Sequence, residues 1–139
     1  MIVKDHQFIG LTLLSASSIT SLVSTRVYHG MRPKVSQLKD LPAIDYYQLP
    51  GGSKYMGTVS RTFTVNCRAT DPAVVRQLGD AVVDLFGGTS GAGTYGNSSS
   101  FTVARASIAR DNGTMVEDDS ETFNVPIDVL IVYTTDTVS

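Results

Sequence analysis

The fold of this chain is indicated most clearly by residues 60–88, which read SRTFTVNCRATDPAVVRQLGDAVVDLFGG. In residues 60–69 apolar and polar side chains alternate, and this period of two is typical of a strand with one buried face. Phe63, Val65 and Cys67 share that face, so we expect them in the core. Cys67 is then a small buried apolar side chain and not a reactive thiol.

A helix is predicted directly after this strand. Asp71 can accept a hydrogen bond from the first turn, and Pro72 suits the first helical position. Apolar residues then recur at intervals of three and four until Gly87 and Gly88 end the pattern. They are Val74, Val75, Leu78, Ala81, Val82, Leu85 and Phe86. A helix of this length suits packing across one face of a small sheet.

The flanking sequence predicts the remaining elements. Residues 8–23 carry apolar side chains at helical spacing, and the serines within 15–18 weaken helix propensity there, so one helix or two are expected. The apolar positions of this opening segment are Phe8, Leu11, Leu14, Ile19, Leu22 and Val23. Further strands are predicted at residues 26–29, 43–49, 101–110 and 123–133. In the last of them Pro126 indicates a sheet edge or a bulge.

The order of these elements predicts an α+β fold. We expect an antiparallel or mixed sheet of about four to five strands, with two main helices packed on one face. The chain has 139 residues, which suits a single domain spanning residues 1–139. Residues 87–100 are mostly Gly, Ser, Thr and Asn, a composition that predicts a flexible loop.

Composition excludes several classes of protein. The one cysteine cannot form a disulfide scaffold within the chain, and the net charge of −2 gives no overall field to attract nucleic acid or an anionic membrane. The first residues make a poor signal peptide, and the apolar run at residues 8–14 is too short to span a bilayer. We therefore expect a chain that is made in the cytoplasm and has no membrane partner.

The chemistry-bearing residues do not form a recognisable enzyme motif. His6 and His29 have no partner at metal-binding spacing, and no glycine-rich phosphate loop or nucleophile elbow is present. The carboxylates of residues 117–121, with Asp111 nearby, do not match the spacing of a calcium loop, so we interpret them as a solvated turn. The sequence predicts no catalytic residue, no cofactor and no metal site.

Several segments, taken in order, resemble the tail completion and tail terminator proteins of long-tailed bacteriophages. The first part of the resemblance is a short N-terminal helix followed by Arg26-Val27-Tyr28-His29-Gly30 with Pro33, and then Leu41-Pro42 before a strand with Tyr46-Tyr47. The second part is the strand Phe63-Thr64-Val65-Asn66-Cys67 and the helix segment Ala81-Val82-Val83-Asp84-Leu85. The third part is a last strand ending in Val132-Tyr133. The resemblance covers most of the chain. The Gly/Ser-rich segment 87–100 departs from the pattern and is interpreted as an insertion.

The resemblance implies a structural virion protein without catalysis. Such a protein forms a ring, usually a hexamer, that caps the finished tail tube and joins the tail to the DNA-filled head. The implied partners are further copies of the chain, the tail tube protein and the head–tail connector or neck proteins, and DNA passes through the ring without sequence-specific binding. The implied location is the virion, at the head–tail junction of the tail.

Charge and loop position suggest which residues make the subunit or partner contacts. A basic segment between two predicted strands contains Arg32, Lys34 and Lys39. An acidic segment before the last strand contains Glu117, Asp118, Asp119 and Glu121. Opposite charges held apart in one chain can meet across a head-to-tail interface.

Two alternative functions remain open from the sequence. One is a neck or connector protein on the head side of the same junction. The other is a monomeric α+β domain that binds nucleic acid, which requires a basic sheet face. The candidate residues for such a face are Arg61, Arg68, Arg105 and Arg110.

Overall fold

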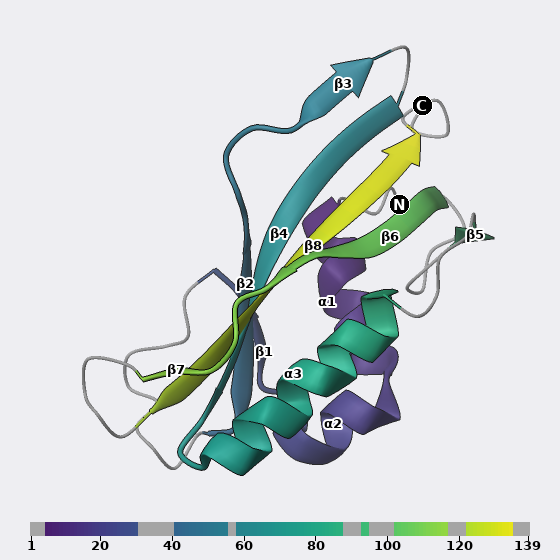
Figure 1. Cartoon of the computed structure of the whole chain (residues 1–139). Helices are drawn as coiled ribbons and strands as arrows, with labels where there is room; N and C mark the ends of the chain where they lie inside the picture. The colour runs from purple at the N-terminus through teal and green to yellow at the C-terminus, as the bar shows by residue number, and fades with distance from the viewer. Residues whose placement is uncertain are drawn as a thin grey trace.

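The strand and helix that the sequence indicates most clearly are both present. A computed structural model of the chain describes residues 5–30, 41–55, 58–87, 93–94, 102–116 and 122–134. The alternating segment forms β4 (Thr58–Ala69), and the following segment forms α3 (Pro72–Gly87) (Figure 1). Asp71 begins the helix as expected, because its Oδ1 accepts a hydrogen bond from the backbone N–H of Ala73 at 2.8 Å.

The other elements follow the predicted order, with three short additions. They are α1 (Asp5–Ser15), α2 (Ser17–Val23), β1 (Val27–His29), β2 (Ala43–Gln48), β3 (Ser53–Tyr55), β5 (Gly93–Thr94), β6 (Thr102–Asp111), β7 (Met115–Val116) and β8 (Phe123–Thr134). The opening segment is two helices, because Ala16 takes an extended conformation between them. The five predicted strands are confirmed, whereas β3, β5 and β7 have two or three residues each and were not predicted.

The strands form one mixed sheet in the order β1-β2-β4-β8-β6-β5, with β3 paired to β4 and β7 paired to β8. The β1–β2 pair is parallel, and the other pairs are antiparallel. The predicted α+β class is therefore confirmed, with a mixed sheet.

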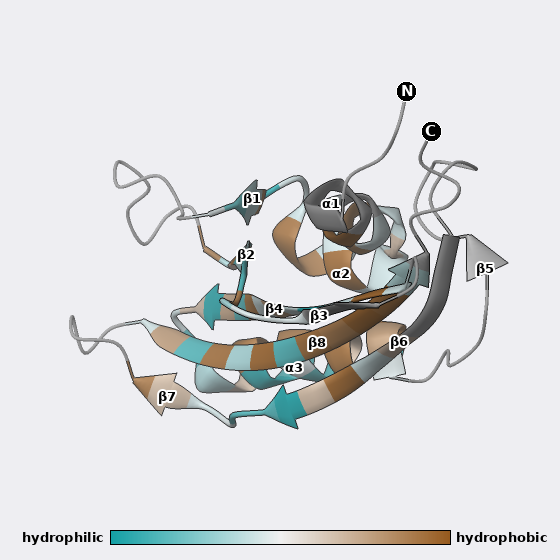
Figure 2. Ribbon diagram, turned by 90° about the horizontal axis from the view of Figure 1, so that it is seen from above, coloured by the Kyte–Doolittle hydropathy of each residue, from teal (hydrophilic) through white to brown (hydrophobic). Residues whose placement is uncertain are grey.

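All three helices lie on one side of the curved sheet (Figures 1 and 2). The predicted inward face of β4 is confirmed, since Phe63, Val65 and Cys67 are fully buried. Their partners on β8 are Val129, Ile127 and Val125, which are also fully buried. Figure 2 shows the resulting alternation of hydrophobic and hydrophilic residues along β8. The helix α3 packs Val75, Leu78, Val82 and Phe86 against this face.

The buried face of α1 differs from the one that the sequence predicts. Leu14 is 41% exposed, whereas Ile9 and Leu13 are fully buried. Ile9 and Leu13 are four residues apart and lie on one helical stripe, and Leu14 is about 100° further round the helix. The break at Ala16 then lets α2 bury its own residues, Ile19 and Val23, without keeping Leu14 in line.

Pro126 does not mark an edge, because β8 lies between β4 and the strands β6 and β7. It lies opposite the break between β6 and β7, where the chain leaves the sheet for residues 112–114. The carbonyl oxygen of Pro126 accepts hydrogen bonds from both the backbone N–H and Nδ2 of Asn112, each at 3.0 Å. Gly113 follows with φ +74°, the left-handed conformation that glycine adopts readily. Of the two predicted alternatives at Pro126, a sheet edge or a bulge, the structure is nearer to the second, because the strand pairing opposite Pro126 is irregular and β8 is not an edge strand.

Candidate interaction surfaces

The seven residues predicted to make contacts all lie outside the described part of the chain. They are Arg32, Lys34, Lys39, Glu117, Asp118, Asp119 and Glu121. Most of the segment 87–100 lies outside it as well; of that segment, the structure describes Gly87 at the end of α3 and the two residues of β5, which pair with β6.

Ala43, which follows the basic segment, and Met115, which precedes the acidic segment, lie at the same end of the sheet. Gly30, which precedes the basic segment, lies further along β2, where its backbone N–H donates a hydrogen bond to the carbonyl oxygen of Tyr46. Ala43 of β2 pairs with Arg68 of β4. Arg68 pairs with Asn124 of β8, and Asn124 pairs with Met115 of β7. The basic sequence 31–40 comes shortly before Ala43, and the acidic sequence follows β7. Neighbouring strands are about 4.8 Å apart, so β2 and β7 are separated by about 14 Å in this row.

A groove with several polar side chains runs between α2 and α3. Its volume is about 600 Å³. It is lined by Ser18, Ser21, Ala73, Arg76, Gln77, Asp80, Ala81 and Asp84. Hydroxyl, amide, carboxylate and guanidinium groups can bind a polar protein surface through hydrogen bonds and ion pairs. The groove therefore presents both charged and uncharged hydrogen-bonding groups.

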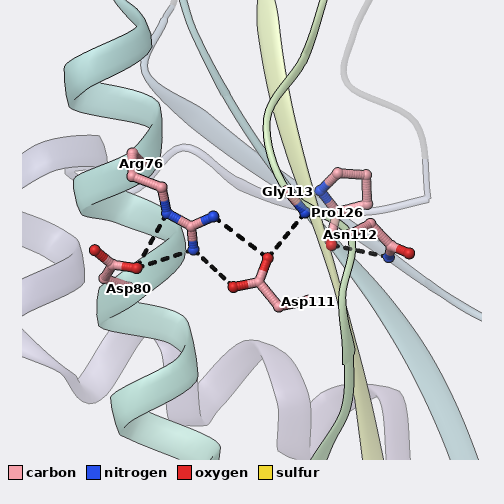
Figure 3. A network of polar contacts seen from close by, with 6 residues as sticks. All are labelled: Arg76, Asp80, Asp111, Asn112, Gly113 and Pro126. Atoms are coloured by element: carbon pink, nitrogen blue, oxygen red, sulfur yellow. Dashed lines mark hydrogen bonds and ion pairs between the residues drawn. The ribbon is translucent and has the colours of Figure 1, made fainter.

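Arg76 joins this groove to the sheet (Figure 3). Its Nη2 lies 2.9 Å from Oδ1 of Asp80 and 2.9 Å from Oδ2 of Asp111. Asp111 Oδ1 also accepts hydrogen bonds from Nη1 of Arg76 at 3.3 Å and from the backbone N–H of Gly113 at 3.0 Å. The guanidinium thus connects α3 to the end of β6, next to the break before β7.

The hydrogen bond from Arg76 lowers the pKa of Asp111, while partial burial works in the opposite direction. The same hydrogen bond raises the pKa of Arg76. Both side chains are about one-third exposed, so solvent screens the pair and its contribution to stability is about 1 kcal/mol or less. Asp111 is therefore part of a structural ion pair.

The sheet face opposite the helices carries a second polar network. The Asp45 carboxylate, 3% exposed, accepts hydrogen bonds from Nδ2 of Asn66 at 2.9 Å and from Nε of Arg68 at 2.6 Å. On the same face Oγ1 of Thr64 donates to Oδ1 of Asp128 at 2.8 Å. Burial of these charged groups is offset by their mutual pairing.

The arginines that the sequence offered for nucleic-acid binding do not form a basic sheet face among the described residues. Arg61 shares the strand face of Phe63, on the side that the helices cover. Arg68 is paired with Asp45, and Arg110 lies across the strands from Asp128. The side chain of Arg105 lies outside the described part of the chain.

Cys67 is in the core, where burial raises the pKa of its thiol far above the ordinary range. Within the described ranges no three His, Cys, Asp or Glu side chains gather as metal ligands would. None of the helices in these ranges has the length and apolar character needed to cross a membrane.

An exposed apolar pair lies on β7, a strand too short to be predicted from periodicity. Met115 is 46% exposed and Val116 is 61% exposed. The only signal in the sequence is that these two apolar residues directly precede the acidic segment 117–121.

Comparison with known proteins gives a likeness of fold. No family model matches the sequence, and no curated protein matches it. A chain from a structure described as the virion of a native gene transfer agent (GTA) particle has a similar fold, with a TM-score of 0.63 and 15% sequence identity. The likeness covers 88% of this chain and 89% of that chain. It therefore extends over nearly the whole of both chains.

Proposed function

We propose that this chain is a structural, non-enzymatic virion protein of a phage-like particle. The observation that supports this most directly is the fold shared with a gene transfer agent virion chain over 88% of this chain and 89% of the other. The resemblance of the sequence to tail completion and tail terminator proteins is independent support, because it rests on the order of segments and not on the fold comparison.

Within the particle, we propose that the chain caps the tail tube as a ring, usually a hexamer, at the head–tail junction. Its partners are then further copies of itself, the tail tube protein and the connector or neck proteins, and DNA passes through the ring. Each copy is made in the host cytoplasm and is built into the virion during assembly. The second candidate is a neck protein on the head side, which shares the same structural role.

We propose that the contacts between copies use the basic residues Arg32, Lys34 and Lys39 and the acidic residues Glu117, Asp118, Asp119 and Glu121. Support comes from the flanking strands, because β2 and β7 are separated across one end of the sheet. A contact between two different surface patches can repeat from copy to copy around a ring. A contact between two identical patches stops at a dimer.

The alternative of a nucleic-acid-binding domain has less support. A basic sheet face is required for it, and the described arginines Arg61, Arg68 and Arg110 are on different faces or lie beside carboxylates. Their positive charge is therefore not concentrated where a phosphate backbone could lie.

The test combines native mass spectrometry with electron microscopy of purified tail tubes. Lys34→Glu with Lys39→Glu is expected to hinder ring formation, and Asp118→Lys with Asp119→Lys in the same chain is expected to restore it in part. High salt should slow assembly more than it dissolves finished rings, since the Debye length falls from about 10 Å at 0.1 M to about 3 Å at 1 M. A chain that stays monomeric at every concentration, with or without tail tubes, would refute the ring.

A further inference from the structure

We infer that Asn112 is a deamidation site of this chain, and that the hydrogen bonds around it keep its amide intact while the chain is folded. Asn112 is the only one of the four asparagines in the sequence that is followed by glycine. Both residues lie in the link between β6 and β7, where Asn112 is exposed and Gly113 is half-buried. The inference uses only residues of one copy, so it is independent of the proposed ring.

The chemistry needs only water and the two residues themselves. The backbone nitrogen of Gly113 loses its proton and forms a bond with Cγ of Asn112, while the bond from Cγ to Nδ2 breaks. The amide nitrogen takes up that proton and leaves as ammonia, and a cyclic succinimide remains. Water then opens the ring at either carbonyl, which gives aspartate or isoaspartate at position 112. Glycine favours the ring closure because it has no Cβ beside the attacking nitrogen.

The attacking nitrogen is held by a carboxylate. The backbone N–H of Gly113 donates a hydrogen bond to Oδ1 of Asp111 at 3.0 Å. This bond stabilises the protonated nitrogen, and the negative charge of the carboxylate opposes the loss of the proton. The nitrogen of Gly113 is therefore a poor nucleophile while the bond is made.

The side chain that would be attacked is held by β8. Nδ2 and the backbone N–H of Asn112 both donate to the carbonyl oxygen of Pro126, each at 3.0 Å (Figure 3). The leaving nitrogen is thus occupied as a hydrogen-bond donor, and the amide is fixed against the strand. Any rotation that presents Cγ to the nitrogen of Gly113 has to break this hydrogen bond first.

Arg76 on α3 supports this arrangement from the other side of Asp111. Its Nη2 lies 2.9 Å from Oδ2 of Asp111, and its Nη1 donates to Oδ1 at 3.3 Å. The hydrogen bond from Arg76 lowers the pKa of Asp111, so the carboxylate is ionised at the neutral and alkaline pH at which deamidation proceeds. The guanidinium therefore positions the carboxylate that holds Gly113. We call Arg76, Asp111 and Pro126 the Asn112 clamp.

Deamidation would loosen the link between β6 and β7. A carboxylate at position 112 has no hydrogen to donate to the carbonyl oxygen of Pro126, and it places a second negative charge next to Asp111. Isoaspartate also adds a carbon atom to the backbone between the two strands. One of the hydrogen bonds that delay the reaction is therefore lost in its product.

The first experiment compares the folded and the unfolded chain at the same mildly alkaline pH. The full chain is incubated with and without guanidinium chloride, and peptide mapping by mass spectrometry follows aspartate and isoaspartate at position 112. The unfolded chain should react at least about tenfold faster, because the folded chain reacts only after the site opens. Equal rates would overturn the inference, and so would an unfolded chain that forms no isoaspartate.

The second experiment separates the Asn112 clamp from the stability of the whole fold. Asp111→Ala removes the carboxylate and should speed deamidation of the folded chain at least about threefold, the equilibrium factor of an exposed ion pair. Asp80→Ala is the matched control, because it removes the other carboxylate beside Arg76 and leaves the clamp in place. Val82→Ala weakens the buried core without touching the clamp. Both controls should deamidate at the wild-type rate.

A further variant acts on the clamp without changing Asp111 itself. Arg76→Gln leaves Asp111 bonded to Gly113 but removes its support, so the rate should also rise, and this variant decides the question if Asp111→Ala does not fold. Circular dichroism checks the fold of every variant. If Val82→Ala speeds the reaction as much as the clamp variants do, global unfolding governs deamidation and the clamp is refuted. Clamp variants that react at the wild-type rate would refute it as well.

Discussion

Replacement of Gly79 by alanine is expected to destabilise this protein, although the same change in an exposed helix stabilises it. Glycine in the middle of a helix costs about 1 kcal/mol relative to alanine, through the entropy of the unfolded chain. Gly79 lies within α3, so propensity alone predicts a gain in the free energy of unfolding.

The structure predicts a larger opposing cost. A Cβ at position 79 would lie 2.8 Å from Cγ1 of Val125 and 3.1 Å from Nη2 of Arg76. Val125 is fully buried in β8 and its β-branched side chain has little rotameric freedom, so either α3 or β8 must shift. Overpacking of this kind costs about 1–3 kcal/mol. The net expectation for Gly79→Ala is a loss of about 1 kcal/mol.

Urea unfolding followed by circular dichroism measures this difference. The matched control is position 77, an exposed site on the same helix, where Gln77→Ala should exceed Gln77→Gly in stability by about 1 kcal/mol. In a Val125→Ala background, Gly79→Ala should cost less than it does in the wild type, because the methyl group that obstructs the new Cβ is already absent. If Gly79→Ala is more stable than wild type by the margin found at position 77, then α3 does not approach β8 as closely as described.

Three further changes test other parts of the structure. Val82→Ala removes two fully buried methyl groups and should lower the free energy of unfolding by about 2 kcal/mol. Asp84 is exposed on the same helix, so Asp84→Ala should change it by about 0.5 kcal/mol or less. A reversed order of the urea midpoints would contradict the assignment of Val82 to the buried face of α3. Cys67 should resist a thiol-specific reagent until the protein unfolds, because burial raises the pKa of its thiol; rapid labelling without urea would show that the core is open there. Asp111→Asn should cost about 1 kcal/mol or less near pH 7. That cost should fade on acidification, because the lowered pKa of Asp111 confers stability above the ordinary carboxyl pKa and loses it as the pH falls through the lowered value; equal losses at pH 7 and pH 2 would refute the pairing with Arg76.

Most of the fold follows from periodic patterns in the sequence. The alternation in β4 and the three-and-four spacing in α3 are long enough to determine both the element and its buried face. The strands β3, β5 and β7 have two or three residues, too few to display any period, and they form because longer strands beside them offer hydrogen bonds. Leu14 is not on the predicted buried face, because the buried stripe of α1 passes through Ile9 and Leu13, and the break at Ala16 lets α2 bury a stripe of its own.

The polar networks could not be predicted from local sequence. Asp45 and Arg68 are 23 residues apart and meet through the pairing of β2 with β4. Arg76 and Asp111 are 35 residues apart and meet because α3 packs beside the end of β6. The sequence alone presents Arg68 as an available basic residue and Asp111 as a neighbour of an acidic turn. In the structure Arg68 pairs with Asp45, and Asp111 pairs with Arg76. The expected contact residues remain a prediction, because they lie outside the described ranges.

The buried carboxylate of Asp45 has a consequence for how the two halves of the sheet align. Asp45 is directly opposite Asn66 in the β2–β4 register, and both side chains are on the face away from the helices. A slip of β2 by one residue would turn Asp45 into the apolar core and move Ile44 out of it, since strand side chains alternate between faces. A buried carboxylate without Arg68 costs several kcal/mol, and this cost adds to the loss of the buried apolar contacts of Ile44. The polar face of β2 therefore disfavours a slipped register as its apolar face does, so both faces select the same alignment with β4.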